Sequence, residues 1–200
     1  RRDGSDFLIS GQKTYISGVD QADAILVVAR LEGATSGRLE PALFMMPTDA
    51  PGLARTHIPT EVRTPERQFQ LFFDDVRLPA ESLIGDGDTA LLMLFAGLNP
   101  ERIMASGMAI GTARFAMDRA TKYANERQVW KTPIGAHQGV AHPLAQCKIE
   151  MELARLMMRK AAALVDAGMD DLAGEAANMA KYASGEVSAR TVDQAIQTLG

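Results

Sequence analysis

The residue types that most often carry out chemistry are few in this chain, and they form no common catalytic or metal-binding motif. The sequence contains three histidines, at positions 57, 137 and 142, and one cysteine, Cys147. Structural zinc sites combine four cysteine and histidine ligands, and these scattered residues do not supply such a set. The phosphate-loop, HExxH, GxSxG and CxxC motifs are absent as well. We therefore expect no metal site, and we expect Cys147 to be a buried apolar residue.

Two charged residues, Glu101 and Arg127, stand at opposite ends of a long helical pattern. A carboxylate in the first turn of a helix is stabilised by the positive end of the helix dipole, and a cation in the last turn by the negative end. Both residues therefore have a purely structural interpretation, which must be weighed against any chemical role. The chemical roles depend on the family resemblance described below.

Length and composition indicate a globular protein. The chain has 200 residues, of which 46% are hydrophobic and 23% are charged, and its formal net charge is −4. Nucleic-acid and membrane-surface binders usually carry a clustered basic patch, which this charge balance does not favour. No apolar run approaches the roughly 20 residues of a membrane-spanning helix, and residues 1–6 are too polar for a secretory signal peptide. We expect a soluble protein without a membrane span or a nucleic-acid partner.

The first part of the chain has the pattern of short strands separated by turns. Apolar or alternating runs occur at residues 7–9, 14–17, 24–29, 42–46 and 68–73. Because no helical pattern lies between them, an antiparallel sheet or barrel is predicted. The pattern changes at residues 85–88 (GDGD), which we interpret as a tight turn because the lysine of a phosphate-binding loop is missing. The predicted β-domain therefore covers residues 1–88.

Residues 89–200 have the pattern of an up-and-down helical bundle, which makes the fold class α+β. Asn99 is predicted to cap the first helix, with Pro100 at its first position. Gly168 is predicted to end the second helix, and Asp170 or Asp171 to cap the third. The three predicted helices cover residues 100–127, 143–167 and 171–200. We expect this bundle domain to be truncated, because no closing element follows the third predicted helix.

The buried faces of the predicted helices are marked by apolar and small residues that recur every three or four positions. In the first helix these are Ile103, Ser106, Ile110, Ala113, Met117, Ala120 and Ala124. In the second they are Leu144, Cys147, Met151, Ala154, Met158, Ala161 and Val165. In the third they are Leu172, Ala176, Met179, Ala183, Val187 and Ile196.

A family resemblance is carried by four stretches: residues 11–18 (GQKTYISG), 72–88 (FFDDVRLPAESLIGDGD), 99–138 and 194–200 (QAIQTLG). Together they resemble the acyl-CoA dehydrogenases, flavin enzymes that desaturate acyl-CoA thioesters. The chain resembles most of the middle β-domain of that family and most of its C-terminal helical domain. The resemblance implies FAD as the cofactor and an acyl-CoA as the substrate.

The resemblance also implies roles for six residues as FAD contacts. Tyr15, where the family often has tryptophan, and Ser17 would lie beside the flavin ring. Arg127 would bind the FAD diphosphate across a subunit interface, which suits the fork geometry of a guanidinium. Trp130, Gln138 and Gln197 would contact the adenosine half. Lys131 stands where the family usually has glycine.

The catalytic base has two candidate positions. In family branches that act on long-chain and some branched acyl groups, a glutamate at the position of Glu101 is the base, followed by an arginine, here Arg102. Most other branches place the base in a later segment, beyond Gly200. Asn99 and Arg102 would lie at the substrate end of the pocket.

The implied reaction is α,β-dehydrogenation to a trans-2-enoyl-CoA, a step of fatty acid β-oxidation, with electrons passed to an electron-transferring flavoprotein. The resemblance also implies a homodimer or homotetramer, in the bacterial cytoplasm or the mitochondrial matrix. Two alternatives remain open. An acyl-CoA oxidase or related flavoenzyme of the same fold would pass the electrons to oxygen, and a flavin-free interaction module would keep only the fold.

Overall fold

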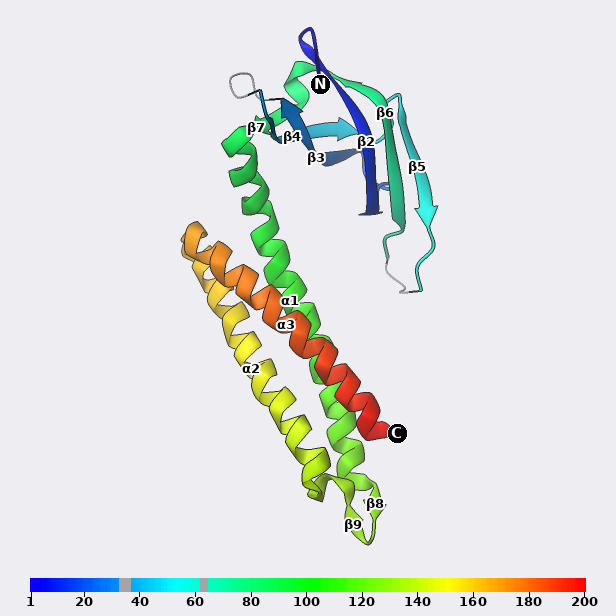
Figure 1. Ribbon diagram of the computed structural model, residues 1–200, viewed down its shortest axis with the longest axis vertical. Coiled ribbons are helices and arrows are strands. Elements are labelled where there is room, and N and C mark those ends of the chain that lie inside the picture. Colours follow the sequence, from blue (N-terminus) through cyan, green and yellow to red (C-terminus); the bar gives the residue numbers. More distant parts are fainter. Residues whose placement is uncertain (33–36, 62–64) are drawn as a thin grey trace. The chain divides into compact units, whose positions relative to one another are not determined.

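The computed structural model describes residues 1–32, 37–61 and 65–200. These residues divide into two compact units, residues 1–94 and residues 95–200 (Figure 1). The first unit contains β-strands and the start of a long helix, and the second is helical apart from one small hairpin. Within the described residues, no helix is both long enough and apolar enough to cross a bilayer.

The described strands of the first unit form two antiparallel sheets (Figure 1). One sheet has the order β1-β2-β6-β5, with β1 at Arg2–Asp3, β2 at Asp6–Ser17, β6 at Gln68–Leu78 and β5 at Leu53–Ile58. The other has the order β3-β4-β7, with β3 at Ala24–Glu32, β4 at Leu39–Pro47 and β7 at Leu83–Asp86. The short helix η1 (Ala80–Ser82) joins β6 to β7. The five predicted strand runs fall within β2, β3, β4 and β6, whereas β1, β5 and β7 were missed.

The core of the first unit contains apolar side chains from both sheets. Phe7 of β2 and Phe44 of β4 meet edge to face, with ring centroids 5.0 Å apart. Buried residues of β2, β3, β4 and β6 form one hydrophobic cluster around this pair. Burying these side chains is the main favourable contribution to folding of the unit.

Two β-bulges interrupt the pairing of β2 with β6, and each changes which side chains face the core. Near the start of β2, Ser10 lies opposite both Asp74 and Asp75 of β6, and Asp75 has a φ of 44°. A hydrogen bond from Ser10 and the charge of Arg1 lower the pKa of Asp75. Further along, Thr14 and Tyr15 of β2 lie opposite the single residue Gln70. The first bulge adds a residue to β6 and the second adds one to β2, so the original register is restored.

The described part of the second unit is built from three long helices and a hairpin (Figure 1). Helix α1 spans Gly87–Glu126, α2 spans Gln138–Asp166 and α3 spans Asp170–Leu199. Between α1 and α2 lie the strands β8 (Gln128–Val129) and β9 (Thr132–Pro133), followed by the short helix η2 (Ile134–Ala136). The fold therefore agrees with the predicted α+β class.

The predicted helix starts were wrong. Asn99 does not cap α1, because the helix begins at Gly87 and Asn99 is buried within it. Pro100 and Pro143 both lie inside helices rather than at their first positions. The residues before Asn99, TALLMLFAGL, are mostly good helix formers, and they continue the helix despite the hydrogen bond that Pro100 cannot donate. The cap position of α3 is Met169, so Asp170 and Asp171 are first-turn acids and not caps.

The predicted faces of α1 and α2 are largely confirmed, but that of α3 is partly wrong. On α1 only Ile103 of the predicted stripe is less than fully buried, and on α2 only Met158 and Val165. On α3, however, Leu172, Met179 and Ile196 are exposed. The buried residues of α3 are mostly small: Ala173, Ala176, Ala177, Ala180, Ser184, Val187, Thr191, Ala195 and Thr198. Small side chains allow the helix backbones to approach closely, which explains this choice of face.

We predict that Gly52→Ala strongly destabilises the first unit. Gly52 has a φ of 88°, and a Cβ atom there would lie 2.5 Å from the backbone oxygen of Asp74, at the first bulge. The clash adds to the left-handed backbone strain. Gly4→Ala is the matched control, because Gly4 has a φ of 65° with no atom within 4 Å of a built Cβ. Urea unfolding should show a clearly larger loss for Gly52→Ala, and equal losses would contradict the model of a clash.

Candidate functional site

The second β-bulge holds an exposed aromatic side chain in a strained conformation. Tyr15 has a φ of 59°, and its side chain is 67% exposed. For a bulky residue this backbone region is unusual and costs about 1–2 kcal/mol. Bulges beside functional sites often redirect a side chain. The strain at Tyr15 therefore marks this end of β2 as a candidate site.

Ser17 lies at the same end of β2, paired with Gln68 of β6. The Ser17 hydroxyl is within 3.1 Å of Gln68 Oε1, and Gln68 Nε2 is within 2.9 Å of Ser17 Oγ. Both side chains reach solvent. The pair offers a hydroxyl and an amide to a ligand that covers this end of the sheet. Gln68 was not identified by sequence reasoning, because only the strand register brings it opposite Ser17.

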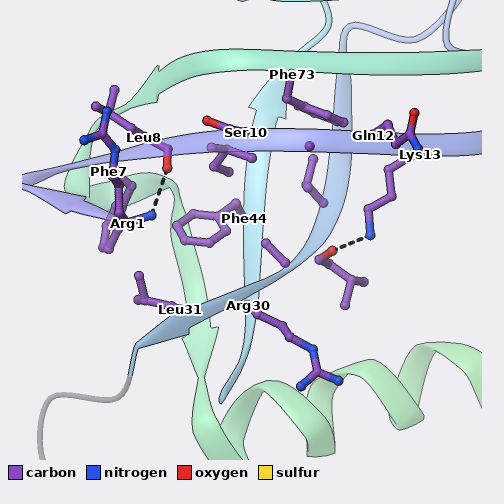
Figure 2. A pocket seen from close by; sticks show the side chains of 15 residues that line it. Arg1, Phe7, Leu8, Ser10, Gln12, Lys13, Arg30, Leu31, Phe44 and Phe73 are labelled. Carbon is purple, nitrogen blue, oxygen red and sulfur yellow. Dashed lines mark hydrogen bonds between the residues drawn. The ribbon is translucent and has the colours of Figure 1, made fainter. Parts of the chain in front are cut away.

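A pocket of about 250 Å³ opens between β2 and β3 (Figure 2). Its apolar wall includes Phe44 and Phe73, and its polar groups include Gln12 and Lys13. The Lys13 ammonium donates a hydrogen bond to the Val28 carbonyl oxygen at 2.7 Å, which links the two strands (Figure 2). Neither Tyr15 nor Ser17 lines this pocket. The pocket is therefore distinct from the bulge site.

In the second unit, Asn99 and Arg102 of α1 form a connected pair. The Arg102 guanidinium donates to Asn99 Oδ1 at 3.1 Å and lies over the Phe95 ring, 5.4 Å from its centroid. Asn99 is buried beside Gly174 of α3, where a built Cβ would come within 3.2 Å of Asn99 Nδ2. Asn99 thus fixes the direction of Arg102 and is itself poorly placed to reach a ligand.

Glu101 is exposed and lies in the interior of a 40-residue helix. The structural interpretation made from the sequence, that its carboxylate stabilises a helix N-terminus, therefore fails, because the dipole effect is confined to the first turn. Asp88 is the acidic residue of that turn. Its exposed carboxylate is open to a substrate and can serve as a proton acceptor.

Past the end of α1, the hairpin β8–β9 presents Trp130 at its tip. Trp130 and Lys131 form the two-residue loop, with φ values of 51° and 66°. This pattern defines a turn that normally requires glycine or asparagine. Lys131 adopts the left-handed conformation in spite of its Cβ. Trp130 is 85% exposed and presents a large flat surface.

His137, the residue before α2, contacts this hairpin and was not identified by sequence reasoning. Its ring meets the Trp130 ring edge to face, with centroids 5.9 Å apart. The His137 Nε2 atom is buried without a hydrogen-bond partner among the described residues. A buried polar atom without a partner is costly, and a bound ligand is one way to satisfy it. This orphaned nitrogen is the signal that the sequence could not provide.

Four residues lie at one end of the helical unit. They are the residues that the family resemblance assigns to the diphosphate and the adenosine half of FAD. Arg127 follows α1, Trp130 lies in the hairpin, Gln138 begins α2 and Gln197 lies in the last turn of α3. Packing of Met117, Leu144 and Ala195 holds these three helix ends together. No described residue forms an ion pair with the Arg127 guanidinium.

Glu101 lies far from this end. At about 1.5 Å per residue, the stretch of α1 between Glu101 and Arg127 is about 39 Å long. The structure therefore separates Asn99, Glu101 and Arg102, which lie within one turn of α1, from the four residues of the hairpin end. Within the described residues, no group of three or more histidine, cysteine or acidic side chains is placed to hold a metal ion.

Comparison with known proteins gives consistent results. The model of the acyl-CoA dehydrogenase C-terminal domain matches residues 91–200. Acyl-CoA dehydrogenase FadE12 of Mycobacterium tuberculosis is 63% identical over 200 residues, 100% of this chain and 52% of that protein. Glutaryl-CoA dehydrogenase of Desulfococcus multivorans is 34% identical over 197 residues, 98% of this chain and 50% of that protein. The chain thus spans about half the length of the curated relatives it matches.

Solved structures agree with the sequence matches. The glutaryl-coenzyme A dehydrogenase glutaryl-CoA complex has a TM-score of 0.79 at 32% identity, over 98% of this chain and 50% of that chain. Butyryl-CoA dehydrogenase from Megasphaera elsdenii has a TM-score of 0.81 at 24% identity, over 100% of this chain and 52% of that chain. These matches confirm the resemblance and the fold class expected from the sequence.

We predict that Tyr15→Gly is more stable than Tyr15→Ala by about 1 kcal/mol. Both changes remove the exposed ring, but only glycine also relieves the cost of a Cβ in the left-handed region. The difference between their unfolding free energies in urea therefore isolates the backbone strain at the bulge. Equal stability of the two variants would mean that Tyr15 is not strained.

Proposed function

This chain belongs to the acyl-CoA dehydrogenase family, and we propose that the protein that carries it oxidises an acyl-CoA thioester with FAD as its cofactor. The observation that carries the proposal is the exposed ring of Tyr15 on a strained backbone, two residues before the exposed Ser17 at the same end of β2. A conformation that costs stability is retained more readily where it serves binding. The product is a trans-2-enoyl-CoA.

The residues of the β-domain suit the flavin end of FAD. Tyr15 offers a flat aromatic surface that is largely open to solvent, and Ser17 offers a hydroxyl that can donate to a ring heteroatom. No backbone or side-chain movement is needed to expose either group. Their position at one end of β2 allows a single planar ligand to contact both.

The residues at the hairpin end suit the other half of the cofactor. A guanidinium without an ion-pair partner matches the oxygens of a diphosphate. The exposed Trp130 ring offers a stacking surface to an adenine, and the orphaned His137 Nε2 atom can exchange a hydrogen bond with a polar group of the nucleotide. Gln138 and Gln197 add amide donors and acceptors at the same end.

Within one chain, Glu101 and Arg127 lie too far apart along α1 to contact the same FAD molecule. We infer that they serve different cofactor molecules. Glu101 and Arg127 are about 39 Å apart along the helix, which exceeds the span of one extended FAD. A single FAD that lies beside Glu101 therefore cannot also reach Arg127 of the same chain. We propose that Arg127, Trp130, Gln138 and Gln197 complete the site of a neighbouring protomer, in a homodimer or homotetramer.

In the proposed reaction, Glu101 removes the proton from the α-carbon beside the thioester carbonyl. Arg102, oriented by Asn99 and Phe95, lies one residue away on α1 and binds a polar group at the substrate end. The chemistry that bound FAD supplies is acceptance of the β-hydrogen as a hydride, so that the α–β bond becomes a double bond. The two electrons then pass to an electron-transferring flavoprotein. The contribution of the protein is to orient the substrate for these two transfers.

The electron acceptor separates this proposal from the oxidase alternative. An acyl-CoA oxidase of the same fold would release hydrogen peroxide when acyl-CoA is added in air. A dehydrogenase would reduce its flavin and keep it reduced until an electron-transferring flavoprotein or a dye accepts the electrons. A protein that lacks the flavin absorption band after expression and after incubation with FAD would refute both ideas.

We predict that Glu101→Gln lowers the rate of flavin reduction by acyl-CoA about 100-fold or more, because a general base commonly contributes 10²–10⁴-fold. The FAD content should be unchanged. Flavin bleaching in single-turnover experiments measures the rate, and Glu175→Gln, an exposed acid on α3, is the control. An unchanged rate in Glu101→Gln would exclude Glu101 as the base and favour the alternative position beyond Gly200.

We predict that Arg127→Ala weakens FAD binding about 10- to 100-fold, the effect of losing a charge-assisted hydrogen bond. The dissociation constant can be measured from the quenching of flavin fluorescence. Arg114→Ala is the control, because Arg114 is an exposed arginine of the same helix, well before the hairpin. If both variants bind FAD as tightly as the unaltered protein, Arg127 only stabilises the end of α1.

A further inference from the structure

The Ser17 hydroxyl has one proton, and Gln68 competes for it. Both ends of the Gln68 amide are within hydrogen-bond distance of Ser17 Oγ: Oε1 at 3.1 Å and Nε2 at 2.9 Å. If Oε1 accepts the Ser17 proton, the hydroxyl has no proton left for a ligand. If Nε2 donates to Oγ instead, the hydroxyl proton remains available. The two arrangements differ in what Ser17 can offer.

The backbone keeps Gln68 in this position. Ser17 and Gln68 are directly opposite each other in the antiparallel pairing of β2 with β6. Just beyond them, the Gly18 amide donates to the Arg67 carbonyl at 3.0 Å, which closes the ladder. Ser17 therefore meets the amide of Gln68 whenever this register is formed. The shorter of the two contacts is the one in which Nε2 donates.

We propose that Gln68 is a positioning residue that donates its amide hydrogen to Ser17 Oγ and so leaves the Ser17 proton free for a hydrogen bond to the flavin. This inference rests on the proposed function, because it assigns Ser17 to the flavin. Gln68 itself need not touch the cofactor. Its effect is transmitted through the direction of one hydroxyl proton.

The test uses Gln68→Glu in the full-length protein. A carboxylate can only accept, so it captures the Ser17 proton and abolishes the bond to the flavin. FAD affinity should fall about fivefold, as expected for one neutral hydrogen bond. The visible absorption spectrum of the bound flavin should change to that of Ser17→Ala. Gln68→Leu, which neither captures the proton nor directs the hydroxyl, should weaken binding about twofold, and an unchanged affinity in Gln68→Leu would show that Gln68 does not position Ser17.

A double-mutant cycle excludes a direct effect of the new charge. In the Ser17→Ala background there is no hydroxyl proton to capture, so Gln68→Glu should cause no further loss of FAD affinity. A further fivefold loss in that background would overturn the inference and attribute the effect to charge. So would a Gln68→Glu variant that binds FAD with unchanged affinity and an unchanged spectrum.

The outcomes also separate this inference from the proposed function. If the unaltered protein binds no FAD, the proposed function fails. If it binds FAD but the cycle shows no coupling between Ser17 and Gln68, only the positioning role fails. Melting temperatures of the cofactor-free variants verify folding, and they should agree with the unaltered protein because both side chains lie at the solvent-exposed end of the strand pair.

Discussion

The arrangement of the first unit depends on two compensating irregularities in one strand pair. The bulge at Asp74 and Asp75 inserts a residue into β6, and the bulge at Thr14 and Tyr15 inserts one into β2. Either alone would shift the register by one residue, and a one-residue shift turns every later side chain to the opposite face. Together they let both strand ends keep their apolar residues in the core. The left-handed Tyr15 is part of this solution, so its exposed ring follows from the constraint that also preserves the core.

The sequence could predict the four longest strands of the first unit, β2, β3, β4 and β6, but not the bulges, for a physical reason. Apolar runs such as residues 24–29 mark a strand whichever register it adopts. A bulge forms where the residue-by-residue pairing of two strands shifts. The sequence of neither strand alone shows where that shift occurs. Glycine at the left-handed position would have signalled it, but here the position holds Tyr15. The sequence did not identify Gln68 for the same reason, because only the strand register makes it the partner of Ser17.

The helical predictions failed where local signals competed with packing. Asn99 followed by Pro100 has the chemistry of a helix start, but the residues before it are mostly good helix formers and continue α1 through both positions. On α3 the largest apolar residues were chosen as the buried face. The helix instead buries alanine, serine and threonine, because close approach to its neighbours favours small side chains, and Leu172 and Met179 remain exposed. The family resemblance supplied candidate site residues that no periodicity could, and the structure added His137 through its unpartnered nitrogen.

The length of α1 explains why each proposed FAD site needs residues from two chains. If the hairpin end of one chain completes the FAD site of another, a two-fold axis lets the second chain return the same contribution to the first. Each protomer then supplies one flavin end and one diphosphate end, and neither site is complete in a monomer. The strained backbone of the Trp130–Lys131 loop fits this arrangement. The strain costs stability in a single chain, and contacts of Trp130 with a partner's ligand would offset that cost only in the assembly. Cofactor affinity and oligomerisation should therefore be thermodynamically linked, each strengthening the other.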